Sequence, residues 1–280
     1  MLVADNEVAR ATLFEHVQTL ESDPNFGEPT LQMVADYGEM LDQRMRESHQ
    51  TDRGSQQLSV ALDMPRNRFE GLFARKSVLD VGCGEGVLDR QLATNKKTLI
   101  TALDHNPKVL AKIPPRPNLR TVEGSGDDLQ AAVGDEEFDV VFVAFSTLTW
   151  ARTAVQARRG IESALAACKV GGMAIFIPLI QHPQSHEAYK AALAKGNVPG
   201  YADGQVDPAG IEFAINCVRM EDWMRSTKLR TFEAAENSGR IACSYVASAL
   251  NRRRLSLNSR LGLNHPRYED YSLVATVLEK

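Results

Sequence analysis

Short apolar runs rich in β-branched residues alternate with segments of helical period through the middle of this 280-residue chain. The run FDVVFVAF at 138–145 is almost wholly apolar, as a strand buried on both faces should be. Strands that alternate with helices form βαβ units and so build a parallel sheet. The runs of this kind are 78–81, 98–104, 118–124, 138–145 and 173–178.

Two further runs, RTFEAAE at 230–236 and YSLVATVLEK at 271–280, are predicted to be strands. The chain is therefore predicted to have an α/β fold with a doubly wound, mostly parallel seven-stranded sheet. We expect residues 1–75 to form a helical N-terminal region or lid and residues 76–280 to form the core. Helical cap insertions are expected at about 179–219 and 240–268, the second as a long helix because Ile241, Tyr245 and Val246 share a helical face.

Composition excludes several classes of partner. The net charge is −4 and the pI is about 5.9, whereas proteins that bind nucleic acid usually carry a basic bias. No apolar run approaches the roughly 20 residues of a membrane span, and the N-terminus lacks the pattern of a secretory signal. The four cysteines form no CxxC pair, which disfavours a zinc site or a disulfide framework. Free thiols fit the reducing cytoplasm.

The stretch VLDVGCGEG, 78–86, places three glycines directly after the first predicted strand. Glycines allow a ligand to approach the backbone closely and permit positive φ angles. A dinucleotide fingerprint would read GxGxxG, but here the spacing is GxGxG and Val87 takes the place of the last glycine. Asp80 and Glu85 add negative charge, which would repel a pyrophosphate and suit a cationic ligand. An NAD-dependent reductase is thereby disfavoured.

Asp104 stands at the end of the second predicted strand, 22 residues after Gly82. An acid at this place in a doubly wound fold can accept hydrogen bonds from ribose hydroxyls. The glycine loop and Asp104 together predict a ligand that has a ribose, lacks phosphates and carries positive charge.

These segments resemble, in order, the motifs of the class I S-adenosylmethionine (SAM) dependent methyltransferases, a Rossmann-like family, and in particular its UbiE-like small-molecule type. VLDVGCGEG resembles the first motif, and ALDHNP the segment with the ribose-binding acid. VEGSGDDL, FDVVFVAFSTL and CKVGGMAIFIP resemble the third-, fourth- and fifth-strand motifs. DYSLVATVLEK resembles the family's antiparallel seventh strand. Ser125 and Val170 depart from the usual aspartate and proline.

The resemblance implies SAM as cofactor, with S-adenosylhomocysteine (SAH) as product, and a set of binding residues. The methionine part would lie against Asp80, Gly82, Cys83, Gly84 and Gly86, and its ammonium would reach the Ala144 carbonyl beside Phe145. The ribose would meet Asp104, and His105 would flank the adenine. The adenine edge would meet Gly126 and Asp127, or Asp128 in place of Asp127, although these acids can equally cap a helix.

The sequence leaves the methyl acceptor open. A small molecule methylated on O, N or C is the prediction; an RNA- or protein-modifying enzyme and a SAM-fold protein without methyl transfer are the alternatives. No catalytic residue is assigned, and His182, His186 and Tyr189 are weak candidates. Residues that can line a lid or acceptor pocket, or be core residues instead, are Tyr37, Trp150, Tyr201 and Trp223. No metal site is expected, and the oligomeric state, a homodimer included, is left open.

Overall fold

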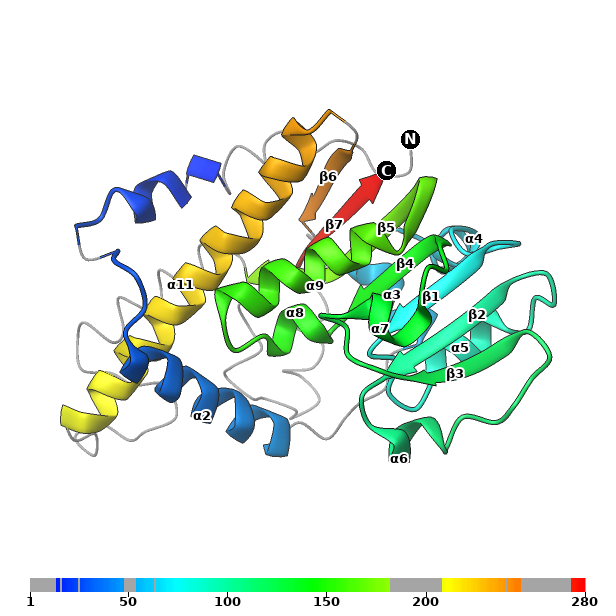
Figure 1. The fold of residues 1–280 in the computed structure, drawn as a ribbon, viewed down its shortest axis with the longest axis horizontal. Coiled ribbons are helices and arrows are strands. Elements are labelled where there is room, and N and C mark those ends of the chain that lie inside the picture. Colours follow the sequence, from blue (N-terminus) through cyan, green and yellow to red (C-terminus); the bar gives the residue numbers. More distant parts are fainter. Residues whose placement is uncertain are drawn as a thin grey trace.

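The computed structural model describes residues 14–15, 17–24, 26–47, 54–62, 64–181, 208–239, 241–247 and 273–279. These residues form a seven-stranded sheet of order β3-β2-β1-β4-β5-β7-β6 (Figure 1). The strands are β1 Ser77–Val81, β2 Leu99–Asp104, β3 Leu119–Glu123, β4 Phe138–Ala144, β5 Cys168–Gln181, β6 Ala242–Ala247 and β7 Leu273–Glu279. Strands β1 to β5 are parallel, and β7 runs antiparallel between β5 and β6. The predicted fold class is confirmed.

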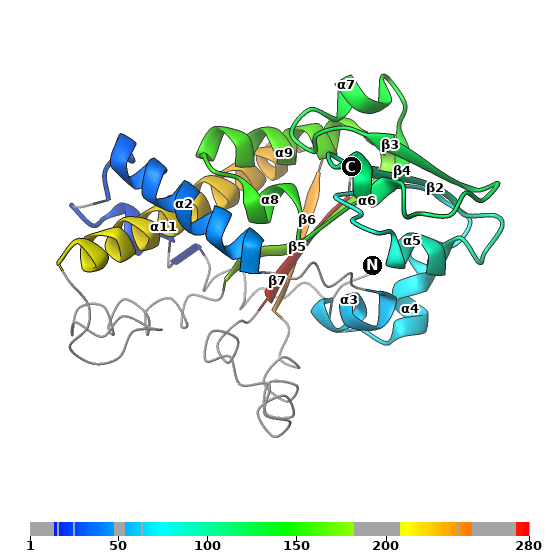
Figure 2. The ribbon, with the colours of Figure 1, turned by 90° about the horizontal axis from the view of Figure 1, so that it is seen from below.

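Helices cover both faces of the sheet (Figures 1 and 2). One face carries α2 Leu31–Glu47, α7 Leu129–Val133, α8 Thr147–Trp150, α9 Ala154–Ala166 and α11 Pro208–Asn237. The other carries α3 Ser55–Ala61, α4 Arg66–Gly71, α5 Val87–Leu92 and α6 Pro107–Leu110. No helix of the described residues is long and apolar enough to cross a membrane.

Strand β4 shows how one run of residues supports both layers. Val141 and Val143 face the cluster under α9 and α11, while Val140 and Phe142 face the cluster under α4 and α5. Phe142 meets Phe73 edge-to-face, with ring centroids 5.4 Å apart. A strand buried on both faces needs apolar residues at every position, which is why β4 reads as a continuous apolar run.

The N-terminal region joins the same core through α2 and α11. Asn216 on α11 donates a 2.7 Å hydrogen bond to Asp36 on α2, and both side chains are buried. Tyr37 and Leu41 of α2 belong to the apolar cluster that also contains Met220 of α11. Helices α2 and α11 share one apolar cluster with the sheet. The predicted domain boundary at residue 75 therefore stays a prediction.

Two predicted elements near the C-terminal end are wrong. Residues 230–236 were expected to be a strand, but they form the last turns of α11, where Phe232 packs on Phe176 with ring centroids 5.4 Å apart. The expected long helix from residue 240 begins instead with strand β6, paired antiparallel with β7. Ala234, Ala235 and Glu236 favour a helix, whereas the run CSYVA is suited to a strand once a partner strand is present.

The helical cap expected at 179–219 also differs from the structure at both of its ends. Strand β5 continues to Gln181, past the expected end at Pro178, and residues 208–219 are the first part of α11. The remainder of this insertion, and residues 248–268 of the second, lie outside the described residues.

Candidate functional site

The glycine loop follows β1 at the edge where the parallel strands end. Gly82, Gly84 and Gly86 have φ angles of 74°, 57° and 68°, a region that side chains strongly disfavour. The N–H groups of Gly82 and Cys83 both donate to the Leu103 carbonyl, at 2.7 and 3.0 Å. The loop is therefore tied to the end of β2 by its backbone, and its glycines are required by its conformation.

Asp104 links the same two strands through its side chain. Its Oδ2 accepts a hydrogen bond from the Gly84 N–H at 3.1 Å, and its Oδ1 accepts one from the Asn106 N–H at 2.9 Å. A carboxylate has about four acceptor positions, so roughly two remain for a ligand. The neighbouring His105 is 81% exposed, and its Nδ1 lies 3.4 Å from Asp104 Oδ1.

Buried carboxylates surround the loop. Burial raises the pKa of the Cys83 thiol, and the nearby negative charges of Asp89, Asp80 and Asp104 raise it further. Cys83 is therefore a protonated, unreactive thiol. Asp80 and Asp104 are 6% and 8% exposed and Asp89 is wholly buried, so their charges are poorly screened by water.

Asp89 was missed by the sequence interpretation. It lies in the first turn of α5, directly after the glycine loop, where the helix N-terminus favours a negative charge. An acid three residues past the last glycine was the available signal. Glu85, by contrast, was given a role that the structure weakens, because its exposed carboxylate forms an ion pair with Lys112. The negative character of the site comes from the buried acids.

The turn after β4 lies between the glycine loop, which follows β1, and the loop of residues 124–128, which follows β3 and is called the third loop below. A β-carbon added to Gly82 would lie 2.2 Å from Ser146 Cβ, and one added to Gly126 would lie 1.9 Å from Thr147 Oγ1. Ser146 and Thr147 therefore touch the backbone of both predicted cofactor loops. These two contacts were not predicted, because they depend on how separate βα turns meet in space.

The two aspartates of the third loop have different hydrogen-bond partners. Asp128 is the N-cap of α7 and accepts a 3.1 Å hydrogen bond from the Ala131 N–H. Asp127 is half-buried and accepts a hydrogen bond from the Ser125 hydroxyl. Asp128 thus has the capping role considered from the sequence, and the role of Asp127 toward adenine stays a prediction.

The structure describes three of the four aromatic residues predicted to line a lid or acceptor pocket. Tyr37 is 6% exposed in the apolar cluster of α2, α9 and α11. Trp223 is half-buried on Phe26, with ring centroids 5.3 Å apart. Trp150 is half-buried, and its indole donates to the Phe145 carbonyl at 3.1 Å. The other candidates, His182, His186, Tyr189 and Tyr201, lie outside the described residues.

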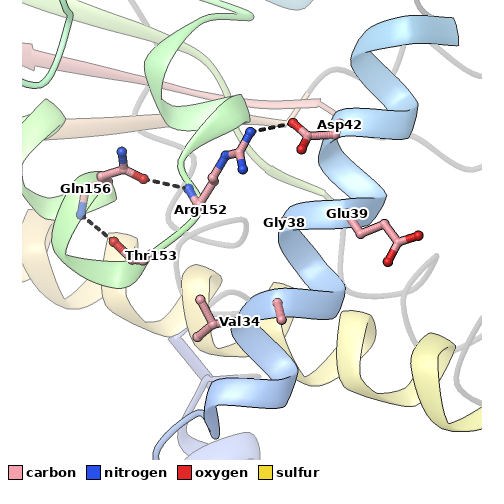
Figure 3. Close-up of a pocket in the computed structure, with 8 residues that line it drawn as sticks. Val34, Gly38, Glu39, Asp42, Arg152, Thr153 and Gln156 are labelled. Carbon is pink, nitrogen blue, oxygen red and sulfur yellow. Dashed lines mark hydrogen bonds and ion pairs between the residues drawn. The ribbon is translucent and has the colours of Figure 1, made fainter.

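A cavity of about 740 Å³ lies between α2 and the turn that joins α8 to α9 (Figure 3). Its polar groups bind mainly one another: Arg152 pairs with Asp42, and its backbone N–H donates to Gln156 Oε1 at 2.9 Å. Its lining residues are Val34, Ala35, Gly38, Glu39, Asp42, Arg152, Thr153 and Gln156, none of which belongs to the glycine-loop site.

The glycine-loop site is compatible with SAM in its charge and in its backbone conformation. The positive sulfonium and ammonium of SAM match the three buried carboxylates, and Asp104 retains acceptor capacity for ribose hydroxyls. Glycines with positive φ leave the loop backbone open to close approach. Within the described residues, no group of three His, Cys, Asp or Glu side chains could hold a metal ion.

The known structures that resemble this chain include three methyltransferases of low identity. The plantazolicin methyltransferase BamL, in complex with a triazolic desmethylPZN analog and SAH, is 13% identical over 99% of this chain and 99% of its own, with a TM-score of 0.49. A putative caffeoyl-CoA O-methyltransferase from Staphylococcus aureus is 13% identical over 87% and 92%, with a TM-score of 0.43. The CcbJ methyltransferase from Streptomyces caelestis is 22% identical over 42% and 50%, with a TM-score of 0.36. Structural similarities this weak do not indicate which acceptor this chain methylates.

The sequence itself matches a family described as "Methyltransferase domain" over residues 78–172. No curated protein matches the chain. The matched range starts in β1 and ends in β5, so it contains the glycine loop, Asp104 and the turn after β4. Residues 78–172 are therefore similar to a methyltransferase domain, and the charge of the site that they form is compatible with SAM.

Proposed function

We propose that the chain transfers the methyl group of SAM to an oxygen, nitrogen or carbon atom of a small-molecule acceptor. The observation that carries the cofactor half of this proposal is the set of buried carboxylates around a glycine loop that has no lysine. When bound, SAM supplies an electrophilic methyl group on a positive sulfur.

The residues of the first two strand ends hold the cofactor. Asp80 and Asp89 stabilise its positive charge from a buried position, where the local dielectric is low. Asp104 accepts hydrogen bonds from the ribose hydroxyls while it keeps the glycine loop in place through Gly84. Gly82 and Gly84 provide a backbone surface without side chains.

The residues of the third and fourth loops complete the site. The Ala144 carbonyl, at the end of β4, would accept a hydrogen bond from the methionine ammonium. Gly126 and Asp127 would meet the adenine edge, and His105, whose ring is exposed, would flank the adenine. These assignments come from the family resemblance, and they are supported by the positions of the four segments at one edge of the sheet.

The acceptor would be held in line with the departing sulfur. Positioning and water exclusion alone can lower such a barrier by roughly 7–11 kcal/mol, so a general base is needed only for acceptors that must lose a proton. The net charge of −4 disfavours a polyanionic acceptor such as RNA. Free thiols at Cys83, Cys168 and Cys217 support a reducing, cytoplasmic setting.

The acceptor class can be tested with SAM labelled in its methyl group. The protein is incubated with a cell extract separated into metabolites, RNA and protein. Label that enters the metabolite fraction, and only with active protein, would support the proposal. Label confined to RNA or protein would contradict the small-molecule assignment, and binding of SAM without transfer to any fraction would favour a SAM-fold protein that does not methylate.

A further inference from the structure

The turn after β4 has a strained residue at its start. Phe145 has a φ of 52°, and among the described residues only Arg75 shares a positive φ without being glycine. The β-carbon crowds the backbone in this region, so a phenylalanine stays there only when its surroundings hold it. Strained residues of this kind concentrate at functional sites.

Hydrogen bonds at both its N–H and its carbonyl hold Phe145 in this conformation. Its N–H donates to the Ile177 carbonyl on β5, and its carbonyl accepts the indole N–H of Trp150 at 3.1 Å. The Trp150 ring packs against the apolar cluster under α9 and α11, so the position of its N–H is fixed by the core. The indole thus binds the strained turn through its N–H.

The same turn touches two of the predicted cofactor loops. Ser146 lies against Gly82 of the first loop, and Thr147 lies against Gly126 of the third. Protein interiors are close-packed, so a shift of the turn would displace both glycine backbones or open a void between them. The conformation of Phe145 is therefore coupled to the shape of the site on two sides.

We propose that Trp150 is a positioning residue, whose indole N–H fixes the turn after β4 and thereby sets the shape of the cofactor site. This assignment rests on the proposed role of the glycine loops in holding SAM. The separate prediction that the Trp150 ring lines an acceptor pocket stays a prediction, because the ring is half-buried.

The first test measures SAH binding by titration calorimetry, which needs no acceptor. Trp150→Phe keeps an aromatic ring and removes the donor, and we expect it to weaken SAH binding roughly three- to tenfold, as for one lost hydrogen bond. Trp223→Phe removes the other indole and is the matched control, because the Trp223 ring lies on α11 against Phe26, with ring centroids 5.3 Å apart. It should bind SAH as the unaltered protein does.

A second replacement separates the hydrogen bond from the shape of the ring. β-(3-Benzothienyl)alanine at position 150 keeps the two fused rings and replaces the N–H with sulfur. It should weaken SAH binding as much as Trp150→Phe does. If Trp150→Phe fails to fold, this variant decides the question.

The third readout is fluorescence, since the chain has only two tryptophans. In the Trp223→Phe protein all indole emission comes from Trp150, and we expect saturating SAH to shift it. In Trp150→Phe the remaining Trp223 emission should not change. Unchanged SAH affinity in the benzothienyl variant, or Trp150 emission that ignores saturating SAH, would overturn the proposal. Failure of the unaltered protein to bind SAH would instead contradict the cofactor assignment.

Discussion

The Asp104 carboxylate accepts a hydrogen bond from the backbone N–H of Gly84 at 3.1 Å, so the end of β2 supports the glycine loop that follows β1. Gly84 follows β1 and Asp104 ends the neighbouring parallel strand β2, and the two residues are 20 positions apart in the chain. Asp104 is thus expected to have two roles: it shapes the loop, and it presents its remaining acceptor positions to a ribose.

Replacing Asp104 should weaken cofactor binding more than any other single change of charge. Asp104→Ala removes the acceptor for Gly84 and the predicted acceptor for ribose, and we expect a loss of about 1–3 kcal/mol in SAH binding free energy. Calorimetry with SAH measures this. Glu123→Ala is the control, because Glu123 is the register partner of Asp104 on β3 and is exposed. Equal affinities of the two variants would contradict the role of Asp104.

Asp89 should distinguish SAM from SAH. SAM carries a positive sulfonium and SAH a neutral sulfur, so a buried negative charge near the loop favours SAM. Asp89→Asn keeps the shape and removes the charge, and it should reduce the preference for SAM over SAH by about 1 kcal/mol. The ratio of the two dissociation constants is the measurement, with the exposed Glu137→Gln as control. An unchanged ratio in Asp89→Asn would show that this charge does not act on the ligand.

The contact between Gly82 and Ser146 can be tested by a double-mutant cycle. Gly82→Ala combines a positive φ with a clash against Ser146 Cβ, whereas Gly239→Ala has a φ of 71° but no atom within 4 Å of the new β-carbon. Strain alone costs about 1–2 kcal/mol, and we expect Gly239→Ala to lose that much stability in urea unfolding and Gly82→Ala to lose more. Adding Ser146→Gly should recover part of the loss in Gly82→Ala. Strict additivity would argue against the contact.

Lys228 lies on α11, which is buried between the sheet and α2. It is 9% exposed, and no hydrogen bond or ion pair joins its amine to the rest of the described chain. Burial lowers its pKa to about 8, the charge of Glu221 opposes this, and that of Arg225 adds to it. The unfolded chain binds a proton here up to about pH 10.5, while the folded chain releases it near pH 8.

The unfolded state therefore binds more protons than the folded state between about pH 8 and pH 10.5, so this residue makes the folded state more stable as the pH rises through that range. The gain should be of order 1–3 kcal/mol. Lys228→Met should raise stability at pH 7.5 and remove this part of the pH dependence, as seen in urea unfolding at several pH values. The exposed Lys96→Met is the control. A Lys228→Met protein with unaltered pH dependence would contradict the assignment.

The strands of the sheet could be predicted where a short apolar run between turn residues marks them. Strands β1 to β4 are apolar runs bounded by turn residues, and each lies close to its predicted range. Strand β6 was not predictable in the same way, because its partner β7 begins at Leu273, far along the chain, and local periodicity cannot register that pairing. Phe232 was read as part of a strand, yet its contact with Phe176 belongs to a helix.

The residues of the site also differ in how far the sequence alone could predict them. Asp80, the three glycines and Asp104 were predictable because they occupy fixed positions after strands, and the chemistry of a ribose or a cation follows from their side chains. Ser146, Thr147 and the indole of Trp150 act through contacts between separate turns, so only the folded arrangement brings out their roles. Spacing in the sequence does not encode such contacts.

One calorimetric session tests the central claim, that the loop holds a cationic, ribose-bearing cofactor without phosphates. The protein is titrated in turn with SAM, SAH and NADH. We expect binding of SAM and SAH and none of NADH, since the buried acids at the loop repel a pyrophosphate. Tight binding of NADH, with no heat from SAM or SAH, would contradict it.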